Sequence, residues 1–105
     1  MAQQSMFQVG STIAFAVSNT ALNLEDIGFS AAELKVSDVL RVSVEDAAIR
    51  ETAGVDDPTD SLGHGHEAGE EFQLVTRPVL RRTRFIRRDG DDALCQFSLF
   101  SWSPQ

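Results

Sequence analysis

The residues best suited to chemistry include the only two histidines of the chain. His64 and His66 stand one residue apart, so in an extended segment both side chains lie on one face, and Glu67 follows them. Imidazole and carboxylate groups are zinc ligands, but a zinc site needs three or four ligands and the chain has a single cysteine. The pattern favours histidines that bond backbone carbonyls and close a loop, with Gly63 and Gly65 free to adopt positive φ, over a zinc or nickel site.

Three aspartates precede the histidines, and their carboxylates are the oxygen ligands that calcium prefers. Asp56, Asp57 and Asp60 lack the spacing of a calcium-binding loop and its final bidentate glutamate. Aspartates beside Pro58 are typical of turns, since their side chains bond neighbouring backbone N–H groups and proline fixes φ. We therefore predict a structured turn here, and no metal or other cofactor.

The charges of the chain are unevenly distributed along the sequence. Residues 1–71 carry thirteen acids and three bases, whereas residues 72–105 carry three acids and six arginines, giving −10 and +3 within a net charge of −7. An acidic chain is poorly suited to bind phosphates, which excludes nucleic acid as the main partner. Two interpretations remain open: the acidic loops pair with the arginines within the fold, or a charged face docks on a complementary protein surface.

Five of the six arginines fall in residues 79–88, where apolar residues alternate with them. We expect Phe85 and Ile86 to anchor this segment in the core. In strand geometry the arginines divide between two faces: Arg82, Arg84 and Arg88 on one, Arg81 and Arg87 on the other.

No catalytic constellation stands out. The sequence has no recognisable Ser/His/Asp, Cys/His or paired-carboxylate arrangement and no glycine-rich phosphate loop after a strand, so we predict that the chain is not an enzyme.

The single cysteine, Cys95, cannot form a disulfide within the chain and is expected to be a small buried hydrophobe. The apolar run 13–17 is too short for a signal peptide or a membrane span, which predicts a soluble protein made in a reducing cytoplasm with no membrane partner.

The elements that must position these residues are mostly short strands. Alternating and β-branched runs predict strands at 12–18, 21–24, 39–44, 47–52, 72–75 and 93–102. The short acidic turn at 45–46 indicates that 39–44 and 47–52 form a hairpin, and 53–70 is expected to be a long loop. Ser30 and Glu33 predict a capped helical turn. Together they predict an all-β fold, an antiparallel sandwich or jelly-roll-like domain at 9–105 after a flexible tail at 1–8.

The predicted last strand carries large apolar groups on both faces. Cys95, Phe97 and Leu99 share one face, and Phe100 and Trp102 lie on the other. Two explanations fit: a central strand covered on both sides, or an apolar patch used for assembly.

Several motifs of the chain resemble a group of small proteins of tailed bacteriophages. Those proteins have a strand ending in an Ile-Arg pair, an Asp-Gly-Thr-Asp-Pro-Thr-like loop, a Gly-His step, a glycine turn and a Phe-Ile-Arg strand. The matching segments here are 44–50, 57–59, 63–64, 67–70 and 84–87. The chain departs from the pattern at Glu51, where an aromatic residue is common, and at 53–55, which replace the usual Asp-Gly. The resemblance implies a capsid decoration or cement protein of β-sandwich type, in a group that also includes tail and neck components.

A second resemblance is to Ig-like accessory modules of glycan-active enzymes, which carry a Tyr-Thr-x-Asp-Gly-x-x-Pro-Thr segment. The chain has no tyrosine, and Trp102 is its only candidate for an exposed sugar-binding platform. A carbohydrate-binding module is therefore the alternative function.

The resemblance to phage proteins implies a non-enzymatic virion protein on the capsid surface, with the major capsid protein and copies of itself as partners. The residues expected at the partner interface combine the arginines, the apolar end of the last strand and the two histidines: Arg82, Arg84, Arg87, Arg88, Phe100, Trp102, His64 and His66.

Overall fold

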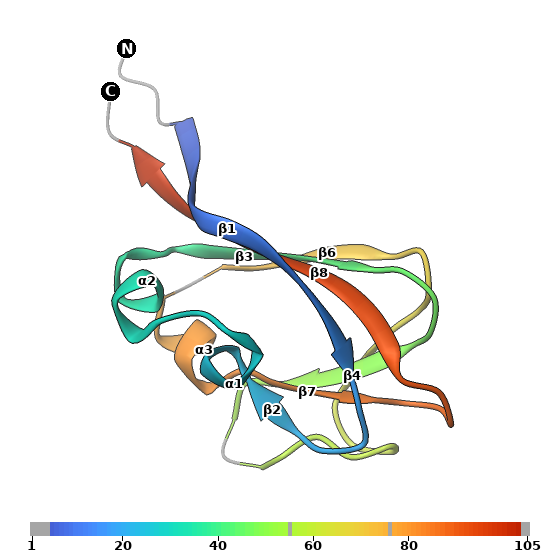
Figure 1. Cartoon of the computed structure of the whole chain (residues 1–105). Helices are drawn as coiled ribbons and strands as arrows, with labels where there is room; N and C mark the ends of the chain where they lie inside the picture. Colours follow the sequence, from blue (N-terminus) through green and yellow to red (C-terminus); the bar gives the residue numbers. More distant parts are fainter. Residues whose placement is uncertain (1–4, 55, 76, 104–105) are drawn as a thin grey trace.

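Two four-stranded antiparallel sheets face each other in the structure of the chain, a computed structural model that describes residues 5–54, 56–75 and 77–103 (Figure 1). The first sheet has the order β1 (Ser5–Val17), β8 (Ala93–Ser103), β3 (Val39–Val44), β6 (Glu71–Val75). The second has the order β2 (Leu22–Asn23), β7 (Arg84–Arg87), β4 (Ile49–Thr52), β5 (His64–His66). The predicted all-β antiparallel sandwich is confirmed.

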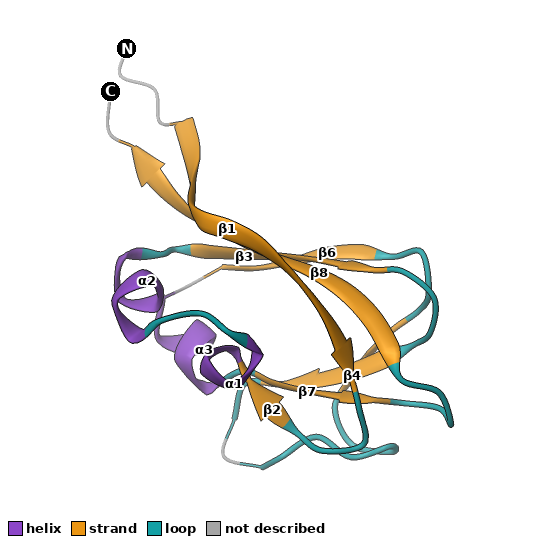
Figure 2. Ribbon diagram, in the orientation of Figure 1, coloured by secondary structure: helices purple, strands orange, loops and turns teal. Residues whose placement is uncertain are grey.

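Three short helices lie together at one side of the sandwich (Figure 2). They are α1 (Leu24–Ile27), α2 (Ala31–Val36) and α3 (Arg77–Arg82). The predicted helical turn is α2, and its capping box is confirmed: Ser30 Oγ accepts from the Glu33 N–H, and the Glu33 carboxylate accepts from the Ser30 N–H. A second capping box of Asn23 and Asp26 starts α1, which limits β2 to two residues where the sequence predicted four.

Strand β3 has the bounds that its β-branched residues predicted, and it organises the first sheet. Leu40, Val42 and Val44 are buried, and β3 pairs with β8 on one side and β6 on the other. Two aspartates flank β3 and bind the backbone of β8. Asp46 Oδ1 accepts a hydrogen bond from the Leu94 N–H at 2.8 Å, and Asp38 Oδ2 accepts one from the Trp102 N–H at 3.1 Å.

The predicted hairpin of 39–44 and 47–52 is wrong, because β3 and β4 belong to different sheets. The N–H of Glu45 donates to the carbonyl of Leu94, and the N–H of Val44 donates to the carbonyl of Glu70. The end of β3 is thus bonded on both sides, and the chain crosses to the other sheet, where β4 pairs with β5 and β7.

The strand geometry used to divide the arginines of 79–88 between two faces holds for only part of that segment. Its first residues belong to α3, whose Leu80 is fully buried, and β7 begins only at Arg84. Proline is tolerated in the first turn of a helix because its missing N–H has no intrahelical partner there, so Pro78 permits this helix. Arg82 therefore does not share a strand face with Arg84 and Arg88.

Two other boundaries differ from the sequence expectation. Residues 5–8, which the sequence predicts to be part of a flexible tail, form the start of β1, because β8 is long enough to pair with them; residues 1–4 lie outside the described residues. The expected loop at 53–70 contains β5, a strand of three residues. Its short His-Gly-His sequence gives too little alternation to signal a strand.

The core is formed where the two sheets face each other. Phe85 of β7 and Phe97 of β8 are fully buried and meet edge to face, with ring centroids 5.3 Å apart. Cys95 lies in the same core, as predicted, and burial, reinforced by Asp46 and Glu45, raises the pKa of its thiol to about 12. The thiol therefore stays protonated at neutral pH and acts as an apolar packing group.

Candidate docking surface

Strands β1 and β8 extend past the rest of the sandwich as a two-stranded ribbon (Figure 1). Pairing of β8 with β3 ends at Phe100 and Val39, whereas pairing of β8 with β1 continues through Trp102 and Met6 to Ser103 and Ser5. The protruding ribbon makes the molecule elongated, with extents of 48 × 27 × 22 Å. We refer to residues 5–8 and 100–103 as the ribbon tip.

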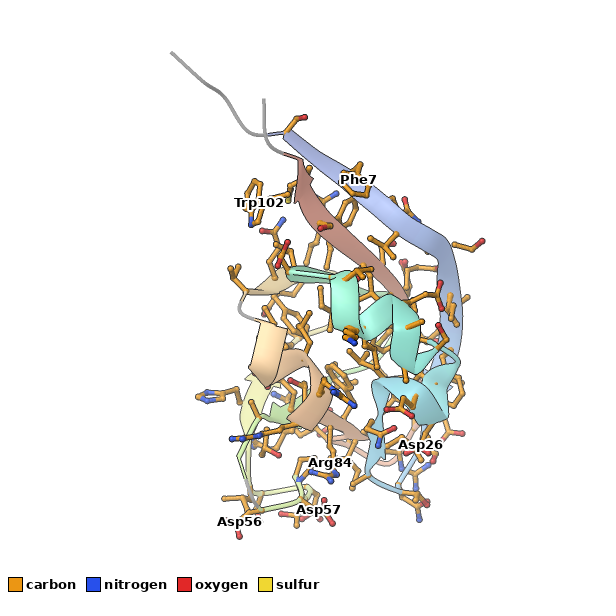
Figure 3. All side chains as sticks on the ribbon, turned by 90° about the vertical axis from the view of Figure 1, so that its left-hand side faces the viewer. Phe7, Asp26, Asp56, Asp57, Arg84 and Trp102 are labelled. Atoms are coloured by element: carbon orange, nitrogen blue, oxygen red, sulfur yellow. The ribbon has the colours of Figure 1, made fainter. Side chains whose placement is uncertain are left out.

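The ribbon tip exposes an aromatic side chain on each of its two faces. Phe7 is 52% exposed and Trp102 is 41% exposed, and Figure 3 shows both at the same end of the molecule. Trp102 is the register partner of Met6, and Phe7 is the partner of Ser101. Because partners share a face and neighbours along a strand alternate, the indole and the phenyl ring lie on opposite faces.

Hydrogen bonds from the body of the sandwich hold the ribbon tip in place. The Asp38 N–H donates to the carbonyl of Phe100 at 2.8 Å, and Asp38 Oδ2 accepts from the Trp102 N–H and the Ser101 hydroxyl, both at 3.1 Å. The Arg41 guanidinium lies over the Phe100 ring, 4.7 Å from its centroid. Phe100 is consequently half-buried, while Trp102 is exposed on a backbone that is fixed.

An irregularity in β1 lies where the ribbon leaves the body. The register shifts between Val9 and Ile13, and Gly10 adopts a φ of 72°. The positive φ favours glycine here, whereas a Cβ at this position would meet only the flexible end of the Glu33 side chain, which can move aside. A bulge of this kind bends a strand and redirects the residues beyond it.

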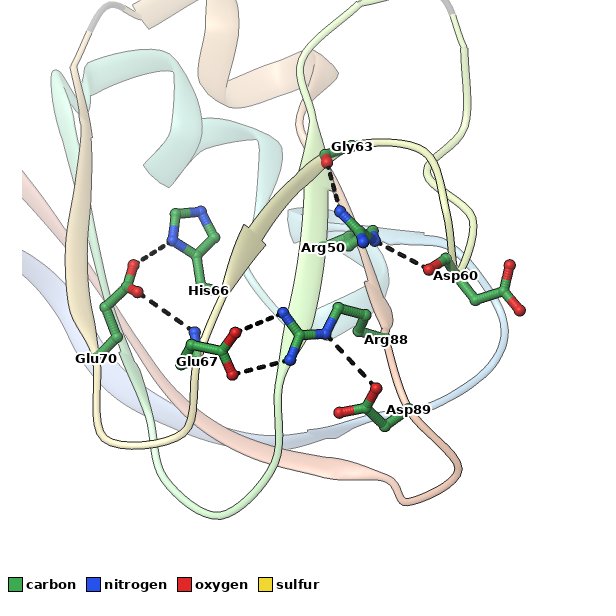
Figure 4. Close-up of polar contacts among 8 residues, drawn as sticks. All are labelled: Arg50, Asp60, Gly63, His66, Glu67, Glu70, Arg88 and Asp89. Carbon is green, nitrogen blue, oxygen red and sulfur yellow. Dashed lines mark hydrogen bonds and ion pairs between the residues drawn. The ribbon is translucent and has the colours of Figure 1, made fainter.

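A second group of polar residues links β4, β5 and β7 at another part of the molecule (Figure 4). The Arg88 guanidinium donates two hydrogen bonds to the carboxylate of Glu67, at 2.7 and 2.8 Å. His66 bonds Glu70 through Nδ1, and its Nε2 lies 3.5 Å from Oε1 of the buried Glu51. These contacts tie the segment after β5 to its neighbours.

The expectation that the histidines bond backbone carbonyls is wrong for His66, whose ring contacts two carboxylates and stacks on Phe72 at 3.5 Å. Glu51, which replaces the aromatic residue common in the phage proteins, points inward from β4 beside that ring. His64 is exposed on β5. Among the residues that the structure describes, no group of three or more His, Cys, Asp or Glu is placed to hold a metal ion.

The predicted turn is present, but the side chain that binds its backbone N–H groups is that of Thr59, and the Asp57 carboxylate pairs with Arg84 instead. The hydroxyl of Thr59 accepts from the Ser61 and Leu62 N–H groups at 3.2 and 2.9 Å, and Pro58 is buried. Arg50 donates to the Asp60 carbonyl at 3.0 Å, which anchors the loop on β4.

Ion pairing sets the pKa values of the two surface glutamates in this group. Hydrogen bonds from Arg88 lower the pKa of Glu67, and the hydrogen bond from His66, followed by that from the Glu67 N–H, lowers the pKa of Glu70. The carboxylate of Glu67 in turn raises the pKa of Arg88.

These shifts predict a loss of stability in acid. The ordinary pKa of both glutamates is 4.5, and a lowered pKa in the folded state means that they stabilise the fold above that value and stop doing so as the pH falls through the folded-state pKa. We expect the free energy of unfolding, measured by urea denaturation, to fall as the pH is lowered below 4.5 and through the folded-state pKa values of the two glutamates. In Glu67→Gln the fall should be smaller.

The matched control is Glu25→Gln, which changes an exposed glutamate of α1. It should retain the acid sensitivity of the unaltered chain. An equal fall in all three proteins would contradict the assignment of this sensitivity to Glu67.

The structure divides the eight residues expected at the partner interface between two regions. Phe100 and Trp102 belong to the ribbon tip, whereas Arg84 lies at the opposite end of the molecule beside Asp57 (Figure 3). The remaining five lie on or beside the second sheet: His64, His66, Arg82, Arg87 and Arg88.

Three of these arginines pair with acids of the same chain. Arg84 Nε lies 3.2 Å from Asp57, Arg87 lies 2.6 Å from Asp92, and Arg88 binds Glu67. The cleft of about 500 Å³ beside Arg87 and Arg88 is therefore lined by guanidinium groups that already have carboxylate partners. Of the two interpretations of the charge pattern, pairing within the fold accounts for these three.

Sequence reasoning missed Phe7 and Asp38 as parts of the ribbon tip. Phe7 lies in the segment predicted to be a flexible tail, and the short stretch Met6-Phe7-Gln8-Val9 before Gly10 has no clear apolar–polar alternation that would signal a strand. Asp38 carries no sequence signal of its role, since its partners lie on β8, far along the chain.

No protein-family model, curated protein or solved structure matches the chain. None of the helices in the described part of the chain has the length and apolar character that crossing a membrane requires.

Proposed function

We propose that the chain is a non-enzymatic structural protein of a tailed-bacteriophage virion that binds the capsid shell through the ribbon tip. The observation that carries the proposal is the exposed aromatic side chain on each face of the ribbon tip, Phe7 on one and Trp102 on the other. The capsid is proposed as the partner because the sequence motifs resemble those of tailed-bacteriophage proteins.

A ribbon with an aromatic group on each face suits a cleft with two walls, such as the junction between neighbouring subunits of a shell. Large aromatic side chains supply most of the binding energy at protein interfaces when they are buried in pockets. Because Asp38 fixes the backbone beneath Trp102, little conformational entropy is lost when the tip inserts. A stable contact would bury about 800 Å² on each partner, more than the two rings alone provide, so flanking residues of β1 and β8 would share it.

The alternative function, binding a carbohydrate, receives less support from the same residues. A sugar ring stacks on a flat aromatic platform, and two platforms that act together must face the same way. Phe7 and Trp102 face opposite ways, so the ribbon tip offers one ring on each side.

A mass-spectrometric inventory of purified virions of the phage that encodes this sequence tests the proposal. We expect peptides of the chain in many copies per particle. Shells assembled without the chain should bind the purified protein on mixing, as measured by co-sedimentation. Virions without such peptides, together with shells that leave the protein in the supernatant, would overturn the proposal.

A further inference from the structure

Strand β1 is an edge strand of unusual composition. It pairs with β8 on one side, and no other described strand pairs with it. Its thirteen residues, SMFQVGSTIAFAV, include no charged residue and no proline, although the chain as a whole has a net charge of −7. Exposed edge strands of natural proteins are normally protected from pairing with other chains by lysines, prolines, bulges or short length. The bulge between Val9 and Ile13 interrupts the edge of β1, and residues 13–17 beyond it form a regular, uncharged stretch.

The other three sheet edges have such protection. Strand β6 has five residues and begins with Glu71, β5 has three residues followed by Glu67, and β2 has two residues and ends in the capping box of Asn23 and Asp26. Of the four edge strands, β1 is the longest even though a bulge interrupts it, and it carries no charged residue. The contrast indicates that this edge is used for pairing.

We infer that β1 pairs in antiparallel orientation with β1 of a second copy of the chain, across a two-fold axis, so that the two four-stranded sheets become continuous. The edge of an antiparallel strand is self-complementary, because the rotation that relates the two copies matches the donors of each with the acceptors of the other. An identical strand without charge also avoids the repulsion that two surfaces of a strongly acidic chain would otherwise cause.

The side chains of β1 beyond the bulge are compatible with such an edge. Ala14 and Ala16 are exposed and small, whereas Ile13 and Phe15 are partly buried against the core. In the joined sheet, apolar residues of both copies would therefore lie on the same side. This inference does not depend on capsid binding, which uses side chains of the ribbon tip.

Lysines on the exposed face of the edge test the inference. In Ala14→Lys/Ala16→Lys, like charges approach each other across the two-fold axis, and we expect the dimer dissociation constant to rise about tenfold or more. The matched control is Ala32→Lys/Ala68→Lys, which changes two exposed alanines of α2 and of the turn before β6 and brings the net charge to the same value, −7 + 2 = −5. The control should dimerise as the unaltered chain does.

Sedimentation velocity over a range of concentrations measures the dimer, and circular dichroism verifies that the variants fold. Hydrogen exchange supplies an independent measurement: backbone amides of β1 should become more protected as the concentration of the unaltered protein rises, and those of β6 should not. A monomer at concentrations up to about 1 mM, or equal dimerisation of the two double variants, would overturn the inference. Either result leaves binding to capsid shells as a separate measurement.

Discussion

Replacing Phe7 and Trp102 with serine is expected to abolish binding to capsid shells while the sandwich remains folded. Aromatic residues at the centre of an interface typically contribute about 2 kcal/mol or more each, so each single variant should bind about thirtyfold more weakly and the double variant should not bind measurably. The fold should tolerate both changes, since the two side chains are 52% and 41% exposed. Co-sedimentation with shells measures the binding, and thermal unfolding verifies the fold.

Leu94→Ser is the matched control for these variants. Leu94 belongs to β8 as Trp102 does and is 39% exposed, but it lies at the other end of the strand. It should bind shells as the unaltered protein does. If Phe7→Ser and Trp102→Ser bound as well as the control, the ribbon tip would not be the docking surface, even where the chain proved to be a virion component.

Phe97→Ala is expected to be the most damaging single change to stability. Phe97 is fully buried on β8 and meets Phe85 of β7 edge to face, so its ring joins the two sheets. Truncation of a buried phenylalanine to alanine costs about 3–5 kcal/mol, through lost burial and the cavity that remains. For a domain of 105 residues this is a large part of the total stability, and many molecules should be unfolded at 37 °C.

Urea denaturation followed by circular dichroism measures the loss, with Phe7→Ala as the control because it removes the same atoms from an exposed position. The control should change the free energy of unfolding by about 0.5 kcal/mol or less. Equal losses in Phe97→Ala and Phe7→Ala would mean that the contact between Phe85 and Phe97 does not hold the sheets together.

The fold class and several elements could be predicted from the sequence where the signal is local. A run of six residues rich in β-branched side chains predicts the bounds of β3, and the Ser30–Glu33 spacing predicts the capping box of α2. The hairpin of β3 and β4 failed because strand pairing depends on competing partners: β6 and β8 already occupy both sides of β3. A short turn between two strands does not reveal such competition.

Of the proposed docking surface, only the part on β8 could be predicted from the sequence. Large apolar residues on both faces of β8 indicate that Phe100 and Trp102 could belong to an interface. The role of Phe7 could not be predicted, because the strand that pairs with its segment lies at the other end of the sequence. The arginines were prominent for the opposite reason: six of them crowd a short segment, yet Arg84, Arg87 and Arg88 each pair with a carboxylate of the same chain. Composition identifies charged residues but not their partners.

The pairing of β1 with β8 has a consequence for synthesis on the ribosome. Among the described strands, β1 is made first and its partner β8 is made last. Until residues 93–103 leave the ribosome, the nascent chain presents an uncharged, apolar strand with nothing to pair with, the kind of segment that chaperones bind and that aggregates when it is crowded. Contacts between distant parts of a chain also form slowly. The first sheet should therefore close late, after translation of β8, and the yield of folded protein should depend on what shields β1 in the interval.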